Sequence, residues 1–168
     1  GRIGRNILRA KIERGISSLE LVAINDLATI ENAAFLLEYD SVHGKLEAII
    51  RHDEHHLYIN DLPPIRYMSE PDPSKLEWAE FGKLFVMECT GLFTNRDDAA
   101  KHIEAGAKRV LVSAPAGNAD LTVVYGVNDK KPRKGHKVVS NASCTTNCLA
   151  PVAQVLNKTC GSARGYMT

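Results

Sequence analysis

Apolar residues recur along the chain at two spacings, one typical of helices and the other of buried strands. From Ile3 to Ala10 they lie three to four positions apart, and the pattern stops at Gly15, so we expect a first helix over about residues 3–14. The apolar run at residues 19–24 predicts a buried strand. A second helix is expected to follow, with an apolar face formed by Ile30, Ala33, Ala34 and Leu37.

The second half of the chain resumes this alternation after a stretch of shorter segments. Between Leu46 and Arg66, a polar turn and the Pro63-Pro64 pair separate short apolar runs, which predicts antiparallel hairpins beside the main sheet. Apolar strands that alternate with helices favour an α/β fold with a doubly wound, mostly parallel sheet. The further elements expected are strands at 84–87, 110–112, 121–125 and 138–139, a helix over about 96–105 capped by Thr94, and a last helix from about 144.

Composition excludes several classes of protein. Lys and Arg total 21 and Asp and Glu total 20, so the formal net charge of +1 leaves no electrostatic footprint for nucleic acid or an anionic membrane. The longest apolar run, residues 33–37, has five residues, far below the ~20 that span a bilayer. The four cysteines lack the paired CxxC spacing of zinc sites, and a chain of 168 residues has core enough to do without disulfides. We therefore expect a reduced, cytoplasmic protein with no metal.

The first residues carry half of a dinucleotide-binding fingerprint. Gly1-x-x-Gly4 opens the first helix, and Asp26 ends the next strand 22 residues after Gly4, near the ~20-residue offset of the carboxylate that binds ribose hydroxyls. An ordinary loop is the alternative for the glycines, and a strand-end turn or helix cap is the alternative for Asp26. If the fingerprint is present, the central strand of the sheet precedes Gly1, so we expect upstream residues that include a strand.

A cysteine stands at the start of the last predicted helix. Cys144 follows a strand, and a thiol in the first turn of a helix sits where the helix dipole favours a thiolate. Ser143 can cap the helix, and Thr145 offers a hydroxyl beside the sulfur. These features suit a cysteine nucleophile, and the alternative is a buried structural cysteine. Cys148, one turn later on the apolar face, fits that alternative better.

The segment SNASCTTNC at residues 140–148, continued by LAPVA, resembles the active-site segment of the phosphorylating glyceraldehyde-3-phosphate dehydrogenase family. The resemblance covers essentially the whole chain. Six further segments match in order, namely GRIGR at 1–5, VAIND at 22–26, YDSVHG at 39–44, TGLF at 90–93, GAKRVLVSAP at 106–115 and GYMT at 165–168. Erythrose-4-phosphate dehydrogenase, a related family that shares the cysteine motif, remains an alternative.

This resemblance implies the NAD-dependent oxidation and phosphorylation of glyceraldehyde 3-phosphate to 1,3-bisphosphoglycerate in glycolysis or gluconeogenesis. Cys144 matches the nucleophile, which forms a hemithioacetal and then a thioester that inorganic phosphate cleaves. Ser143 and Thr145 match residues that contact the substrate or inorganic phosphate. An acidic Asp26 would repel a 2′-phosphate, so NAD is favoured over NADP. The cofactor-binding residues implied are Arg2, Ile3, Asp26, Thr90, Gly91 and Ser113.

The resemblance also implies a domain division and an assembly. Residues 1–142 correspond to a Rossmann-type NAD-binding domain that lacks its first strand, and residues 143–168 to the start of an α+β catalytic domain with its first helix. The family suggests a homotetramer. Its general base is a histidine shortly after the segment that resembles GYMT, so we expect a histidine after Thr168, and we expect residues 1–168 alone to be inactive.

Two local departures and one functional alternative remain. Pro71 stands where the family commonly has an arginine near the adenine, which weakens the expectation of full cofactor affinity, and residues 160–164 lack the usual acidic pattern. A non-catalytic module that binds nucleotides and uses Cys144 as a redox sensor is the alternative to an enzyme. Of the histidines, those at 52–56 are expected in a solvated turn and His102 on an exposed helix face.

Overall fold

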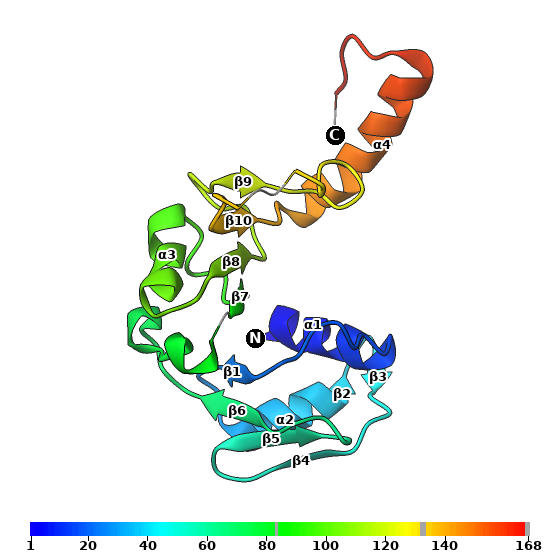
Figure 1. The fold of residues 1–168 in the computed structure, drawn as a ribbon. Coiled ribbons are helices and arrows are strands. Elements are labelled where there is room, and N and C mark those ends of the chain that lie inside the picture. Colours follow the sequence, from blue (N-terminus) through cyan, green and yellow to red (C-terminus); the bar gives the residue numbers. More distant parts are fainter. Residues whose placement is uncertain (83, 132–133, 167–168) are drawn as a thin grey trace. The chain divides into compact units, whose positions relative to one another are not determined.

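The chain falls into two compact units that divide after Phe81. The computed structural model describes residues 1–82, 84–131 and 134–166. The first unit is Gly1–Phe81, and the second begins at Gly82. Figure 1 follows the chain from helix α1 to helix α4 and shows strands and helices in each unit. The last two residues of the GYMT segment lie outside the described residues.

The first unit combines two helices with a four-stranded mixed sheet. Its elements are α1 (Arg2–Glu13), β1 (Ala23–Asn25), α2 (Ile30–Glu38), β2 (Tyr39–Asp40), β3 (Gly44–Lys45), β4 (Ile50–His52), β5 (His56–Ile59), β6 (Ile65–Met68) and the 3-10 helices η1 (Pro73–Lys75) and η2 (Trp78–Phe81). In the strand order β1-β6-β5-β4, β1 and β6 are parallel and the other pairs antiparallel. β2 and β3 form a separate hairpin. The expected hairpins are confirmed, but they extend the sheet of β1 instead of lying beside it.

The strand expected at residues 19–24 is shorter and displaced. β1 spans Ala23–Asn25, and its ladder starts with Ala23 opposite Arg66. β6 itself begins at Ile65, so little of it lies alongside the residues before Ala23. Leu19 is exposed as a result.

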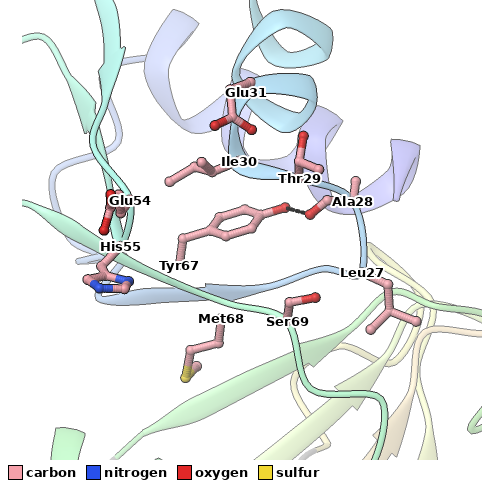
Figure 2. A pocket seen from close by; sticks show the side chains of 10 residues that line it. All are labelled: Leu27, Ala28, Thr29, Ile30, Glu31, Glu54, His55, Tyr67, Met68 and Ser69. Atoms are coloured by element: carbon pink, nitrogen blue, oxygen red, sulfur yellow. Dashed lines mark hydrogen bonds between the residues drawn. The ribbon is translucent and has the colours of Figure 1, made fainter.

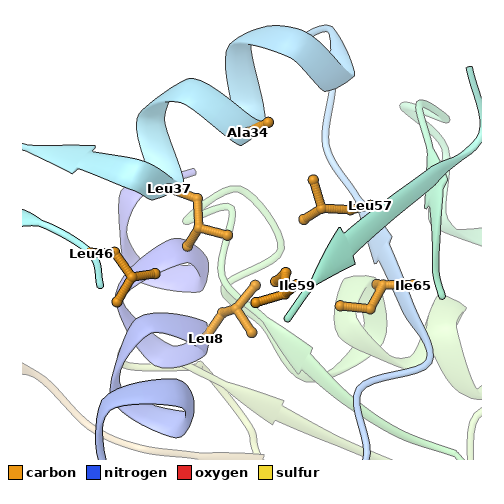
Figure 3. Close-up of a cluster of buried hydrophobic side chains, with 7 residues drawn as sticks. All are labelled: Leu8, Ala34, Leu37, Leu46, Leu57, Ile59 and Ile65. Atoms are coloured by element: carbon orange, nitrogen blue, oxygen red, sulfur yellow. The ribbon is translucent and has the colours of Figure 1, made fainter. Parts of the chain in front are cut away.

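Buried side chains from both helices and the sheet form the core of the first unit. Leu8 comes from α1, and Leu37 comes from α2. On β5, Leu57 and Ile59 are buried while the residues between and before them are less so, which is the alternation of a strand with one covered face. Figure 3 shows the seven buried side chains converging between the helices and β5. The full set is Leu8, Ala34, Leu37, Leu46, Leu57, Ile59 and Ile65.

The second unit contains a parallel sheet. Its elements are β7 (Phe85–Glu88), α3 (Arg96–Glu104), β8 (Arg109–Val112), β9 (Leu121–Thr122), β10 (Val138–Ser140) and α4 (Cys144–Cys160). The strand order is β7-β8-β10-β9, and every pair is parallel. The strand expected at residues 121–125 is limited to two residues, because its partner β10 ends at Ser140, opposite Thr122.

Both units alternate strands with helices, which confirms the predicted α/β class. β1 and β7 each stand at the edge of their own sheet. Within residues 1–82, 84–131 and 134–166, no helix is both long and apolar enough to cross a membrane.

Helix α3 is capped by Asn95 and not, as the sequence predicts, by Thr94. The side-chain oxygen of Asn95 accepts a hydrogen bond from the backbone N–H of Asp98 at 2.9 Å. The carbonyl oxygen of Thr94 instead accepts a hydrogen bond from the backbone N–H of Gly117. Both residue types cap helices, and the start of the helix at Arg96 decides between them.

We expect Asn95→Ala to lower the free energy of unfolding by about 1 kcal/mol, because it removes the acceptor of an N–H group in the first turn. Thr94→Ala is the matched control and should lie within about 0.5 kcal/mol of the parent. Urea unfolding of both variants of the complete protein makes the comparison, and equal losses would contradict the assignment of the cap.

Candidate functional site

The first group of predicted cofactor residues lies in the first unit, where β1 ends and α1 begins. The Gly1 nitrogen is 2.7 Å from Asp26 Oδ2, so the start of the GxxG segment meets the strand-end carboxylate. Asp26 Oδ1 also accepts from the backbone N–H of Ala28 at 3.0 Å, which is the turn role that the spacing leaves open. An aspartate carboxyl ordinarily has a pKa of about 4. At neutral pH the side chain is therefore a hydrogen-bond acceptor only.

The N-terminus of α1 is suited to an anion. The helix begins at Arg2, its first turn has no acidic residue, and no described side chain caps it. The N–H groups of Arg2 and Ile3 have no acceptor within the helix and can donate to a phosphate. The Arg2 guanidinium is held by Asp40, with Nη2 3.0 Å from Oδ1. That bond keeps the pKa of Asp40 well below its usual range. A phosphate contact from Arg2 would therefore use the backbone.

The second group of predicted cofactor residues follows β7 and β8 in the second unit. These strands are parallel, with Glu88 opposite Val112, so the residues after them meet at one edge of the sheet. The Thr90 N–H donates to Glu88 Oε1 at 2.7 Å, and the Ser113 N–H donates to the Glu88 carbonyl at 2.9 Å. Gly91 has φ +76°, a left-handed conformation that favours glycine. The structure thus brings Thr90, Gly91 and Ser113 together.

A buried hydrogen bond between Glu88 and His102 supports this group of residues, and the sequence analysis missed it. The prediction of an exposed His102 is wrong: its side chain is buried, and Nε2 lies 2.8 Å from Glu88 Oε2. Burial raises the pKa of Glu88, but hydrogen bonds from His102 and Thr90 lower it more, so Glu88 is ionised. The available signal was an acidic residue at the end of an apolar strand, where an unpaired charge is rare.

Cys144 is the first residue of α4 and is exposed. Ser143 caps the helix as predicted, and its Oγ accepts from the Thr146 N–H at 3.0 Å. Thr145 is exposed beside the cysteine. The first turn of α4, all of it described, contains no acidic residue, so the cysteine stands where the helix dipole favours negative charge. The alternative of a buried structural cysteine does not hold for Cys144.

Cys148 is also exposed in the described part of the chain, and its burial in a core stays a prediction. The spacing correctly places apolar residues on one side of α4, but no residue of this helix is buried in the described part of the chain. An apolar helix face is buried only where another element covers it. The exposed apolar side chains of α4 are Leu149, Val152, Val155 and Leu156.

Cys144 and the second group of cofactor residues share one sheet edge. β10 and β8 are parallel, with Ser140 opposite Val112, so the segment that leads to Cys144 leaves the sheet beside Ser113. In open parallel sheets, ligands bind outside the carboxyl ends of the strands. This edge is therefore the candidate active site of the second unit. Arg2, Ile3 and Asp26 form a separate group in the first unit.

A hollow of about 420 Å³ lies beside the end of β1. Figure 2 shows Tyr67 within it, its hydroxyl donating to the Ala28 carbonyl at 2.8 Å. Burial, and then the charge of Asp26, raise the pKa of Tyr67 to about 12. None of the predicted site residues is among the ten described residues that line the hollow. Across the described ranges, no cluster of His, Cys, Asp or Glu is arranged to hold a metal ion.

Comparison with models of known protein families identifies the family of this chain. Residues 1–96 match the model described as glyceraldehyde 3-phosphate dehydrogenase, NAD binding domain, and residues 143–168 match the C-terminal domain of the same enzyme. The chain belongs to the glyceraldehyde-3-phosphate dehydrogenase family. Its α/β fold is accordingly the Rossmann-type fold of an NAD-binding domain.

Three bacterial relatives show how far the similarity extends. The chain is 54% identical over 168 residues to a glyceraldehyde-3-phosphate dehydrogenase of Xanthobacter flavus. It is 53% identical over 169 residues to a protein of that name from Geobacillus stearothermophilus and to glyceraldehyde-3-phosphate dehydrogenase 1 of Bacillus subtilis (strain 168). Each alignment covers 100% of this chain and 50% of the relative. The chain therefore spans about half the length of the curated relatives it matches.

Proposed function

We propose that the complete protein containing this chain is an NAD-dependent, phosphorylating glyceraldehyde-3-phosphate dehydrogenase. The observation that carries the proposal is the exposed Cys144 at the start of α4, at the sheet edge that also holds Thr90, Gly91 and Ser113. Family membership supports it. A non-catalytic module that binds nucleotides and senses redox state through Cys144 would use the same residues, so aldehyde turnover is what separates the two proposals.

The proposed reaction forms and breaks bonds at the Cys144 sulfur. The thiolate adds to the aldehyde carbon of glyceraldehyde 3-phosphate and gives a hemithioacetal. Loss of a hydride and a proton from this adduct leaves an acyl thioester; bound NAD supplies the hydride acceptor. An oxygen of inorganic phosphate then attacks the thioester carbon, the sulfur leaves as a thiolate, and 1,3-bisphosphoglycerate is released. A soft sulfur nucleophile suits both the addition and the transfer.

Ser143 and Thr145 are the proposed contacts to the substrate or to inorganic phosphate. The Thr145 side chain is exposed beside the sulfur. Ser143 accepts from the Thr146 N–H and lies 2.8 Å from its hydroxyl, so it has a helix-capping role as well. Both hydroxyls can donate to anionic oxygens. The proton acceptor of the family is the histidine that we expect after Thr168.

The residues proposed to hold NAD fit its parts. An N-terminus of α1 without acidic residues suits the pyrophosphate, through the N–H groups of Arg2 and Ile3. The ionised Asp26 suits the ribose hydroxyls. Thr90, Gly91 and Ser113 are the further cofactor contacts that the family resemblance implies.

Pro71 affects the expected affinity of this site for NAD. Its neighbour Glu70 is held through backbone groups by the Asn25 side chain, with both hydrogen bonds 2.9 Å long. Asn25 precedes Asp26, so the position that commonly holds an arginine adjoins the proposed ribose site. We propose that NAD binds less tightly here than where that arginine is present.

The domain division, assembly and setting stay predictions. The C-terminal domain match at residues 143–168 supports a boundary between residues 142 and 143. A homotetramer, a cytoplasmic location and a place in glycolysis or gluconeogenesis follow from the resemblance. Glyceraldehyde 3-phosphate and inorganic phosphate are the proposed partners.

The proposal is tested by NADH formation from the complete purified protein. Turnover should need NAD, phosphate and glyceraldehyde 3-phosphate together. If kcat/KM is higher with erythrose 4-phosphate, the alternative dehydrogenase is correct. If neither aldehyde is oxidised while NAD still binds, the enzyme proposal fails and the redox-sensing module is favoured.

We expect Asp26→Ser to reduce the preference for NAD over NADP by about tenfold, since it removes a carboxylate that binds the ribose hydroxyls and repels a 2′-phosphate. The ratio of kcat/KM for the two cofactors is the measurement. Asp53→Ser is the control, because Asp53 is an exposed carboxylate of the same unit that likewise accepts backbone hydrogen bonds, in the turn between β4 and β5. An unchanged ratio in Asp26→Ser would remove Asp26 from the proposed site.

A further inference from the structure

One buried hydroxyl connects the two loops that leave the candidate active-site edge. Ser140 ends β10 and is 0% exposed. Its Oγ donates to the Ala114 carbonyl at 2.8 Å and accepts from the N–H groups of Ala116 and Ala142, each at 3.1 Å. The hydroxyl thus uses its one donor and both lone pairs. Ala114 and Ala116 follow the proposed cofactor residue Ser113, and Ala142 lies two residues before Cys144.

The loop before Cys144 has a conformation that needs such an anchor. Ala142 has φ +58°, a left-handed conformation that residues with a Cβ rarely adopt and that persists only where the surroundings hold it. Asn141 is held by its N–H, which donates to the Val112 carbonyl at 2.9 Å. The Ser140 hydroxyl holds Ala142 itself.

A second side chain closes the same loop from the helix. Asn147 Nδ2 donates to the carbonyl oxygens of Asn141 and Ser143, at 2.8 and 2.9 Å. The loop of residues 141–143 is therefore fixed at both ends. Helix α4 starts directly after this loop, at Cys144. The conformation of the loop therefore sets the position of the Cys144 sulfur relative to the strand ends.

We propose that Ser140 is a positioning residue that holds the loop carrying Cys144 in register with the Ser113–Ala116 loop. The proposal rests on the proposed function, in which the adduct on Cys144 must meet a cofactor bound beside Ser113. Ser140 touches neither substrate nor cofactor and acts through these two loops. The hydroxyl hydrogen-bonds to both loops, so its removal takes a hydrogen bond from each of them.

Ser140→Ala in the complete protein tests this role. The variant leaves the N–H groups of Ala116 and Ala142 without their acceptor and loosens the strained Ala142, so the thiol moves. We expect kcat to fall about 100-fold, the cost of a displacement of roughly 1 Å between reacting groups, with a much smaller change in the KM for NAD. The rate at which iodoacetamide alkylates Cys144 at neutral pH should fall as well, about tenfold, because the sulfur leaves its place at the helix start.

Val138→Ala is the matched control for loss of stability. Val138 lies in the same strand and is 1% exposed, but none of its side-chain atoms bonds to either loop. We expect this variant to melt at a lower temperature while kcat and alkylation stay within about twofold. Ser140→Thr keeps the hydroxyl and should restore most of both rates.

Asn147→Ala keeps the test decisive if Ser140→Ala does not fold, because Asn147 lies near the surface and closes the same loop. It should lower kcat about tenfold with little effect on melting. The proposal is overturned if Ser140→Ala, or Asn147→Ala in its place, loses no more kcat and alkylation rate than Val138→Ala. Alkylation needs no turnover, so it tests Ser140 even if the proposed function fails.

Discussion

Replacing Cys144 with serine is expected to lower aldehyde-dependent NADH formation by the complete protein about 10⁴-fold or more. A serine hydroxyl at the start of α4 is almost wholly protonated at neutral pH and adds poorly to an aldehyde, whereas a thiolate is the reacting species of cysteine. Steady-state kcat/KM with glyceraldehyde 3-phosphate is the measurement. NAD binding should be nearly unchanged, because the cofactor group lies on other loops.

Cys148→Ser is the matched control for this substitution. Both cysteines are exposed on α4, four residues apart, so general effects of the replacement are equal. We expect Cys148→Ser to retain kcat/KM within about threefold. Full activity in Cys144→Ser, or an equal loss in both variants, would remove Cys144 from the nucleophile role.

Glu88→Ala is expected to lower the free energy of unfolding by about 1.5–3 kcal/mol, the typical contribution of buried hydrogen bonds to a charged group. It leaves His102 without its carboxylate and the Thr90 N–H without its acceptor. Denaturant unfolding of the complete protein measures the loss. Glu80→Ala removes the exposed pair with Arg66 and should cost less than about 1 kcal/mol. Equal costs would contradict the importance of the buried pair.

The same pair predicts how stability depends on pH. The folded-state pKa of Glu88 is lowered, so its contribution is present at pH above its unfolded pKa of about 4.5 and is lost as the pH falls through the lower folded value. The stability difference between the parent and Glu88→Gln should therefore shrink on acidification below about pH 4.5. A difference that grows as the pH falls would contradict the assignment.

Local rules predicted the parts of the structure that neighbouring residues decide. Ser143 was identifiable as a cap because a hydroxyl precedes a helix, and the hairpins of β4 to β6 because polar turns separate short apolar runs. Each of these features depends on a few consecutive residues or on the order of strand and helix.

The errors have a tertiary cause. His102 is buried because Glu88, fourteen residues earlier on another element, offers it a charged partner. For Cys148 the burial stays a prediction, since nothing in the described part of the chain covers the apolar side of α4. Ser140 received no role because its three partners come from two loops that meet only after the sheet forms.

The most direct test of Cys144 as the nucleophile is a single turnover without phosphate. The complete protein is mixed with NAD and glyceraldehyde 3-phosphate, quenched, and digested for mass spectrometry, while NADH is followed by absorbance. We predict a burst of about one NADH per chain and an acyl group on the peptide containing Cys144, removed when phosphate is added. NADH formation with no acyl group on Cys144, or with the acyl group on Cys148, would contradict the account.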